Sequence, residues 1–422
     1  MQDTNLTRRD FVKTAAATGA LASATGLTPA FGQDGKKVIK VALVGCGGRG
    51  SGAIENHKRA CEHVGVEFKV VATADAFKGA AEGQGKKFGV PDENCFGGFD
   101  AYKKAIDAGP DVVLLATPPG FRPVHFEYAI NAGKHVFTEK PVAVDPPGIR
   151  KFLAAGEMAK QKGLSVVAGT QRRHEKSYLQ NHHRVAAGAI GDIKGGIVSW
   201  LQSRLWFKTR NQGEGDAEYM ARNWVNFTSL SGDHIVEQHV HNIDVAMWFI
   251  GRPPVSALGF GGRARRKTGD QFDYFSVDFD FGQGVHIHSV CRQVNGTYGR
   301  VGEFFVGTKG EVYGNGKLTG DKVDAPDFEE VGGPYVQEHV DLLRSILGNK
   351  ALNETQNVAY ATMAAIMGRM SAYSGQLVRW SDVMENDKSK FFNEICTPTA
   401  ADFEAGTVKC PQEETAPVPG ND

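Results

Sequence analysis

Residues 41–50 read VALVGCGGRG, a stretch in which an apolar, strand-like run leads directly into a Gly-x-Gly-x-x-Gly loop. In a loop of this form Gly45 makes the tight turn, Gly47 lets the backbone approach a pyrophosphate, and Gly50 lets the next helix pack on the strand. The free amide groups at the start of that helix would then receive the phosphates. We therefore expect a dinucleotide to bind the loop residues Gly45, Gly47, Gly48, Arg49 and Gly50.

The composition bounds the class of protein. A chain of 422 residues is too long for one typical core and predicts about two or three domains. Its 48 basic and 48 acidic side chains cancel, so no basic excess indicates a nucleic-acid partner. The six cysteines lack C-x-x-C spacing, which argues against a zinc site. The sequence leaves open whether Cys396 and Cys410 form a disulfide.

The N-terminus predicts an export signal of the twin-arginine (Tat) type. Arg8 and Arg9 precede a mildly apolar stretch at residues 15–27, a pattern that favours residues 1–32 as a signal peptide recognised by the Tat export machinery. The stretch is too short and polar to span a bilayer, so we expect no integral membrane anchor after cleavage and a periplasmic or exported location. The alternative interpretation is an N-terminal arm that happens to contain two arginines.

The first half of the chain predicts an α/β fold. Short apolar strands alternate with helix-length segments, which is typical of a doubly wound parallel sheet covered on both faces. We assign residues 38–170 to such a Rossmann domain. Its strands are expected at 38–44, 68–74, 111–116, 135–138 and 165–168, and its helices at 53–62, 99–108, 124–132 and 148–162.

The second half of the chain has a different pattern of polar and apolar residues. Several strand-like runs alternate polar and apolar residues, which predicts an α+β domain at residues 171–385 with a large, open, mostly antiparallel sheet. Residues 209–223 are expected to form a long loop, and such loops are often functional. A helix is expected at residues 235–250. The tail at 398–422 is rich in Pro, Glu, Ala and Thr and is expected to be irregular.

Two strand ends predict where a nucleotide would lie. Asp75 ends the second expected strand, where a carboxylate suits a ribose 2′-hydroxyl and repels a 2′-phosphate, which favours NAD over NADP. Thr117 and Pro118 end the third strand at the same carboxyl edge. The structural alternative for Asp75 is a solvated carboxylate at a strand end.

Residues Thr138-Glu139-Lys140-Pro141 end the next strand. Lys140 would lie at the carboxyl edge of the sheet near a bound nicotinamide, where it could hydrogen-bond a substrate hydroxyl as hydride leaves. We include Glu139 and Lys140 among the candidate cofactor contacts. A strand-end Glu-Lys pair is otherwise an ordinary feature of protein surfaces.

The densest polar cluster is residues 232–244, GDHIVEQHVHNID. On one helix, Glu237, His241 and Asp244 would share a face, and a carboxylate one turn from a histidine can set the tautomer and basicity of a general base. The open alternatives are a metal site, because His and carboxylates can bind zinc, and a structural polar face. We predict Lys140, His241 and Glu237 as catalytic residues, no metal, and a substrate-binding set of Arg173, Tyr178 and Asp244.

Together these motifs resemble the Gfo/Idh/MocA family of oxidoreductases. The matching segments are the glycine loop, ATPP at 116–119, GKHVFTEKP at 133–141, GAIGDI at 188–193, HNID at 241–244 and GTKG at 307–310, and the resemblance covers roughly residues 38–380. It implies a two-domain fold that assembles as dimers or tetramers, and a sugar or cyclitol oxidised by hydride transfer to NAD(P). Lys140 and His241 match the family's catalytic lysine and histidine, while Glu237 stands where the family usually has Asp.

The sequence is also similar to exported members of the family, some of which hold the nucleotide tightly. Our first hypothesis is an NAD(P)-dependent oxidoreductase acting on a sugar or polyol, with Lys140 and His241 as acid and base and a tightly bound NAD. The second is an NAD-dependent glycoside hydrolase that oxidises its sugar transiently. A nucleotide-bound, non-catalytic sugar-binding protein and a metal-dependent hydrolase are the remaining alternatives.

Overall fold

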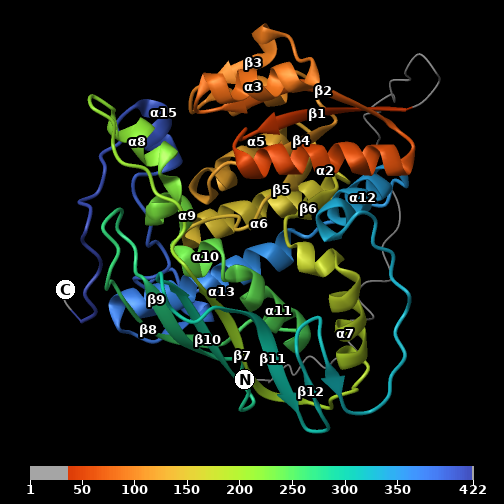
Figure 1. Cartoon of the computed structure of the whole chain (residues 1–422), viewed down its shortest axis with the longest axis vertical. Coiled ribbons are helices and arrows are strands. Elements are labelled where there is room, and N and C mark those ends of the chain that lie inside the picture. Colours follow the sequence, from red (N-terminus) through yellow and green to blue (C-terminus); the bar gives the residue numbers. More distant parts are fainter. Residues whose placement is uncertain (1–36, 421–422) are drawn as a thin grey trace.

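The structure is a computed structural model that describes residues 37–420, so the predicted signal peptide at 1–32 lies outside the described residues. Its first sheet has six parallel strands in the order β3-β2-β1-β4-β5-β6 (Figure 1). In this order β2 and β3 lie on one side of β1 and β4, β5 and β6 on the other, which confirms the doubly wound Rossmann prediction. The strands are β1 (Val38–Val44), β2 (Glu67–Asp75), β3 (Cys95–Gly97), β4 (Val112–Leu115), β5 (His135–Thr138) and β6 (Val166–Ala168).

One helix and one strand of this domain were not predicted from the sequence. Residues 78–88, KGAAEGQGKKF, form α3, and β3 follows at the sheet edge. The helix carries little apolar periodicity because it buries only Ala81 and Gly85, and three residues are too few for a strand pattern. The spacing from the glycine loop to Asp75 is long because α2 runs for 17 residues and β2 for nine.

Helices cover both faces of the first sheet. One of them, α12, comes from the C-terminal half of the chain, and its Val336, Val340 and Leu343 share a core with β1 and α2. The domain boundary predicted at residue 170 therefore divides the sequence, but residues from beyond it still pack in the core of the first domain. The helices around the sheet are α2 (Gly48–Val64), α3 (Lys78–Phe88), α4 (Ala101–Asp107), α5 (Arg122–Asn131), α6 (Pro146–Gln161) and α12 (Pro334–Leu347).

The second domain is built on an eight-stranded sheet in the order β13-β12-β11-β7-β10-β9-β8-β14. Only the β7–β10 pair is parallel among its described pairings, which confirms the mostly antiparallel prediction. The strands are β7 (Ile193–Gln202), β8 (Ser256–Gly262), β9 (Tyr274–Asp280), β10 (His286–Gln293), β11 (Arg300–Gly307), β12 (Glu311–Val312), β13 (Leu318–Thr319) and β14 (Val378–Arg379).

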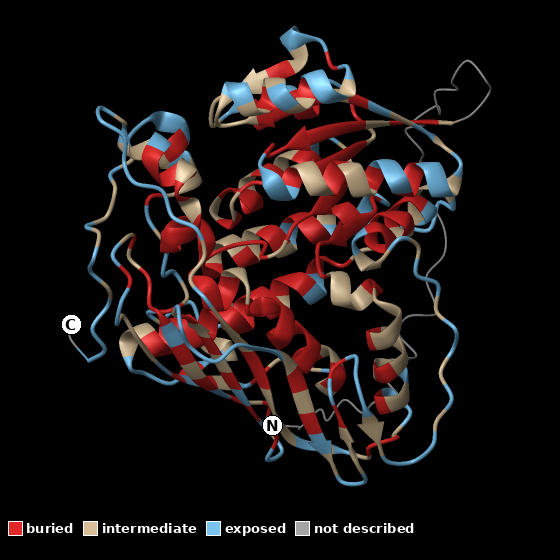
Figure 2. Cartoon of the chain, viewed as in Figure 1, coloured by how far each residue is buried: buried red, intermediate tan, exposed pale blue. Residues whose placement is uncertain are grey.

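Helices lie between the two sheets and form most of the buried core there (Figure 2). The longest, α13 (Thr355–Ser374), buries Ala, Met and Ile side chains along nearly its whole length. Other helices of this half are α7 (Lys176–Ala186), α10 (His234–Glu237), α11 (Val240–Ile250) and α14 (Trp380–Met384). No helix within residues 37–420 is both long and apolar enough to cross a membrane.

The expected helix at residues 235–250 is wrong in one respect, because it is broken into α10 and α11 at Gln238 and His239. Gln238 Oε1 accepts hydrogen bonds from Gln202 of β7 and Gln293 of β10, each at 2.7 Å. His239 Nε2 lies 2.7 Å from Ser289 Oγ. These side chains tie the break to the sheet, so Glu237 and His241 do not share one regular helical face.

Two segments expected to be irregular contain helices. Within the predicted loop at 209–223, α8 (Asp216–Arg222) buries Tyr219 and Met220. The C-terminal tail begins with α15 (Ala400–Ala405), which buries Phe403. No other helix or strand follows α15 up to residue 420. In both cases a few aromatic or apolar side chains anchor a segment whose average composition is polar.

Candidate active site

The glycine loop has the steric demands that its sequence predicts. Gly45 has a φ of +96° and faces the backbone of Ala116, which an added Cβ would meet at 2.6 Å. A Cβ on Gly50 would lie 1.8 Å from the Gly45 carbonyl oxygen, so helix α2 could not pack on the turn. A Cβ on Gly47 would meet nothing within 4 Å, and α2 has no side-chain N-cap. The open space and the uncapped helix start fit a pyrophosphate.

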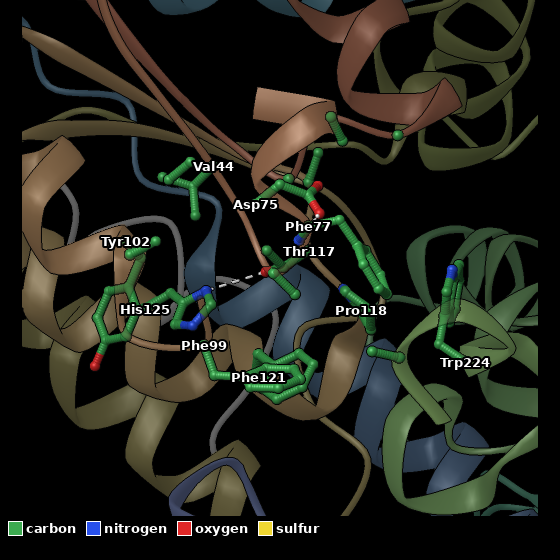
Figure 3. A pocket seen from close by; sticks show the side chains of 18 of the residues that line it. Val44, Asp75, Phe77, Phe99, Tyr102, Thr117, Pro118, Phe121, His125 and Trp224 are labelled. Carbon is green, nitrogen blue, oxygen red and sulfur yellow. Dashed lines mark hydrogen bonds between the residues drawn. The ribbon is translucent and has the colours of Figure 1, made fainter. Parts of the chain in front are cut away.

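A cavity of about 400 Å³ lies beside this loop (Figure 3). Six of the predicted cofactor residues line it: Gly45, Gly47, Gly48, Asp75, Thr117 and Pro118. Six aromatic side chains, none of which the sequence predicted as part of the site, also line it: Phe77, Phe99, Tyr102, Phe121, Trp206 and Trp224. Flat apolar walls with a few polar groups are typical of small-molecule sites, and these residue types suit an adenine ring.

Asp75 lies in the cavity wall at the end of β2. Its two oxygens accept hydrogen bonds from the amides of Cys46 at 2.7 Å and Phe77 at 2.9 Å. Burial raises the pKa of this carboxyl, and the two amide bonds oppose the rise. Each oxygen keeps a further lone pair, so the fixed carboxylate can still accept a ribose hydroxyl.

The other described polar side chains of the cavity wall carry no unpaired charge. Thr117 Oγ1 lies 3.1 Å from His125 Nδ1, and the His125 ring stacks on Tyr102 with centroids 4.0 Å apart. Burial lowers the pKa of His125 to about 3. Arg222 is the one cationic side chain among the described residues that line the cavity, and both Nε and Nη2 donate to Glu214 at 2.6 Å. The cavity therefore offers no unpaired positive charge.

Two of the four remaining cofactor candidates, Arg49 and Glu139, contact each other. Arg49 Nε lies 3.1 Å from Glu139 Oε1, and the Arg49 guanidinium lies over the Tyr335 ring at 5.1 Å. A Cβ on Gly169 would meet Glu139 Oε2 at 2.5 Å, so this glycine, which directly follows β6, makes room for the carboxylate. Arg49, Gly50, Glu139 and Lys140 are not among the residues lining the cavity.

Lys140 follows β5 at the carboxyl edge of the first sheet and reaches the second domain. Its Nζ donates to the Glu237 carbonyl oxygen at 2.6 Å and lies 3.4 Å from Glu237 Oε1. Both side chains are largely buried. The structure thus brings two of the predicted catalytic residues together, although Glu237 contacts the lysine and no hydrogen bond joins it to His241 in the described part of the chain.

His241 is buried at the start of α11, with its ring stacked on Trp200 at a centroid distance of 5.8 Å. Burial, together with the positive charges of Lys140 and Arg172, lowers the pKa of His241 well below its ordinary value. The imidazole is therefore neutral near pH 7, which is the form that can accept a proton. The roles of Lys140 and His241 as acid and base stay predictions.

The predicted substrate residues are engaged with protein partners. Arg173 donates to both oxygens of Asp244, at 2.8 to 3.1 Å. Tyr178 donates to Glu303 Oε2 at 2.9 Å. Their substrate role stays a prediction.

Sequence reasoning missed a second group around Tyr178. The buried Glu303 also pairs with Arg172 and accepts from Asn242 at 2.6 Å. Arg172 lies over the ring of Trp200 at 5.7 Å. The run Gln171-Arg172-Arg173-His174 was a usable signal in the sequence. The arginine that shares the Trp200 ring with His241 is Arg172, one position before the predicted Arg173. Glu303 and Trp200 lie on sheet strands, where nothing local distinguishes them from other half-buried residues.

No group of three or more His, Cys, Asp or Glu side chains within residues 37–420 is arranged to hold a metal ion. All six cysteines, Cys396 and Cys410 included, are free.

The two domains match known family models. Residues 39–170 match a model described as an oxidoreductase family with an NAD-binding Rossmann fold. Residues 178–314 match the GFO/IDH/MocA C-terminal domain. These two matches together span more than half of the chain, so the protein belongs to the Gfo/Idh/MocA family of NAD-binding oxidoreductases.

Curated relatives and solved structures agree with this assignment. The chain is 25% identical over 256 residues to scyllo-inositol 2-dehydrogenase (NAD(+)) of Bacillus subtilis, covering 57% of this chain and 66% of that protein. It is 26% identical over 213 residues to inositol 2-dehydrogenase of Rhizobium meliloti, covering 50% and 57%. The matches thus span less than two thirds of these relatives. The aldose-aldose oxidoreductase of Caulobacter crescentus shares the fold, with a TM-score of 0.63, 18% identity and coverage of 81% and 100%.

Proposed function

We propose that this protein is an NAD-dependent dehydrogenase that oxidises a hydroxyl group of a polyol or sugar. The observation that carries the proposal is the contact of Lys140, at the carboxyl edge of the sheet that also holds the nucleotide loop, with Glu237. The buried His241 follows Glu237 by four residues at the start of α11. The names of the relatives, which are inositol dehydrogenases, support a cyclitol or a related polyol as the substrate class.

In the proposed mechanism, Lys140 and His241 move the hydroxyl proton. A bound nicotinamide would supply the hydride acceptor. His241 is available to accept the proton because burial lowers its pKa and keeps the imidazole neutral. Lys140 donates a hydrogen bond to the substrate oxygen and stabilises the negative charge that develops on it. Glu237 holds the Lys140 ammonium in place through its carbonyl and carboxylate.

The cavity supports NAD over NADP. Asp75 is the negative charge beside the expected ribose, and Glu214 already neutralises Arg222. A 2′-phosphate would therefore meet a carboxylate and no free cation, which costs binding free energy.

Two further proposals concern location and assembly. Arg8 and Arg9 support export through the Tat machinery to the periplasm, where free NAD is scarce and a tightly bound nucleotide is favoured. The outer face of the second sheet exposes Leu258, Phe260 and Tyr274, which supports a homodimer or homotetramer in which this face is covered. Amino-terminal sequencing of the exported protein and light scattering would test these proposals.

The activity is tested with protein purified without added cofactor. We expect bound or bindable NAD, identified by mass spectrometry, and its reduction when an inositol or another polyol is added. Protein that holds no nucleotide and binds none would contradict the proposal. Release of an aglycone from an aryl glycoside without net NADH formation would show the glycoside hydrolase instead.

A further inference from the structure

The cavity beside the glycine loop has a wall that does not belong to the Rossmann domain. Trp206, Ala221, Arg222 and Trp224 all come from residues 203–227, between β7 and α9 (Thr228–Ser231), whereas the other lining residues come from the first domain. Figure 3 shows Trp224 across the pocket from Phe77 and Pro118. The indole of Trp206 is 44% exposed and lies edge-on to Trp224 with centroids 6.2 Å apart.

This wall is held in shape by its own hydrogen bonds. The Asn223 side chain accepts from the Lys208 amide at 2.8 Å, and Asn226 donates to the Trp206 carbonyl at 3.3 Å. Arg222 closes the loop by donating to Glu214 and to the Thr209 carbonyl. The two tryptophans are therefore presented by an ordered segment.

The C-terminal tail connects this wall to the Rossmann domain. On the first domain, Glu404 of α15 accepts from Tyr102 Oη at 3.0 Å and pairs with Lys103 at 2.6 Å. On the second, Asp216 accepts from the Cys410 amide at 2.8 Å, and Tyr219 donates to Glu413 at 2.9 Å. Figure 1 shows α15 beside α8.

A small separate core fixes the junction. Phe403 of the tail is buried and packs against Phe99 and Phe121 of the cavity wall, with centroids 4.9 and 5.0 Å apart. The same cluster includes Tyr219 and Met220 of α8. Phe403 thus packs on the Rossmann wall of the pocket and belongs to the same small core as α8, the helix that supplies Ala221 and Arg222 to the other wall.

We propose that Trp206 and Trp224 are nucleotide-binding residues that cover the adenosine half of the pocket, and that residues 398–413, which we name the strap, are positioning residues that hold them there. The inference rests on the proposed function, because it assumes that the cavity binds NAD. The two indole rings line a cavity that also holds Asp75, and aromatic rings in such a wall offer stacking area to an adenine. Opening the pocket requires the strap contacts to break, so the nucleotide leaves slowly.

The test is the dissociation rate of NADH, followed by the loss of energy transfer from tryptophan when the complex is chased with excess NAD. We expect Trp224→Leu and Phe403→Ala each to raise this rate at least about tenfold, and Glu404→Ala, at a partly exposed position, to raise it less. Trp380→Leu and Phe392→Ala are matched controls, because Trp380 packs on Tyr360 and Phe392 on Arg150, outside the cavity and the strap.

Thermal midpoints of the nucleotide-free variants show whether each one folds. Dissociation rates of Phe403→Ala and Trp224→Leu within about twofold of the native protein would overturn the inference, as would a native protein that releases NADH as fast as these variants. A native protein that binds no nucleotide at all would instead overturn the proposed function, so the two failures are distinguishable.

Discussion

The two ends of the proposed site are built in opposite ways. The nucleotide end is an open cavity whose aromatic and glycine surfaces have space in front of them. The reaction end is a dense set of charged and polar side chains that already satisfy one another, as Arg173 does with Asp244 and Lys140 with Glu237. The difference indicates that the first end binds by shape and the second acts through charges whose positions are fixed before substrate arrives.

The largest difference between the two ends is expected on replacing Lys140 with Met, which keeps the length of the side chain and removes its charge. We expect turnover to fall by about 10²–10⁴-fold, the range for a lost acid–base group, with the dissociation constant for NADH unchanged. Steady-state kinetics and a fluorescence titration measure the two quantities. Loss of nucleotide binding in this variant would show that the two ends are not separable.

The opposite result is expected at the nucleotide end for Gly50→Ala. Its new Cβ would meet the Gly45 carbonyl at 1.8 Å, so α2 must move away from the turn and the pyrophosphate site is lost. We expect the variant to purify without nucleotide and to bind none in a titration. Gly79→Ala is the matched control, since Gly79 lies on α3 with nothing within 4 Å of an added Cβ. A Gly50→Ala protein with native affinity would contradict the steric argument.

A smaller effect is expected at Asp75. In Asp75→Ala the amides of Cys46 and Phe77 lose their acceptor and the ribose loses its partner, so we expect about 10–100-fold weaker NAD binding. NADP binding should fall less, because the repulsion of its phosphate is also removed. Calorimetry with both nucleotides measures the ratio, with Glu82→Ala on the exposed face of α3 as control. An unchanged ratio would remove Asp75 from the specificity argument.

The smallest effect concerns pH. Because the pKa of His241 is depressed well below its ordinary value of about 6.5, the neutral imidazole persists when the pH falls through that value. We expect kcat/KM of the nucleotide-bound enzyme to show no loss with an apparent pKa near 6.5 that is due to His241. The profile of the His241→Asn variant identifies any such limb. A limb near 6.5 that disappears in this variant would contradict the burial argument.

The sequence predicted the parts that depend on local chemistry. The glycine loop and the strand ends were placed well because a turn that needs glycine, and strands too apolar to be exposed, leave local signals. The break in the helix at Gln238 could not be predicted, because its cause is a pair of glutamines on two other strands. The positions of Trp206, Trp224 and Phe403 at or beside the pocket could not be predicted either, because they depend on how the two domains and the tail pack together.

The most direct test of the account is an experimental structure of the protein with NADH and an inositol. We expect the adenine to lie between Phe77 and the two tryptophans, and a substrate hydroxyl to lie within hydrogen-bond distance, about 2.6–3.2 Å, of both Lys140 Nζ and the His241 ring. A nucleotide outside the cavity, or a substrate whose reacting hydroxyl touches neither side chain, would contradict the account.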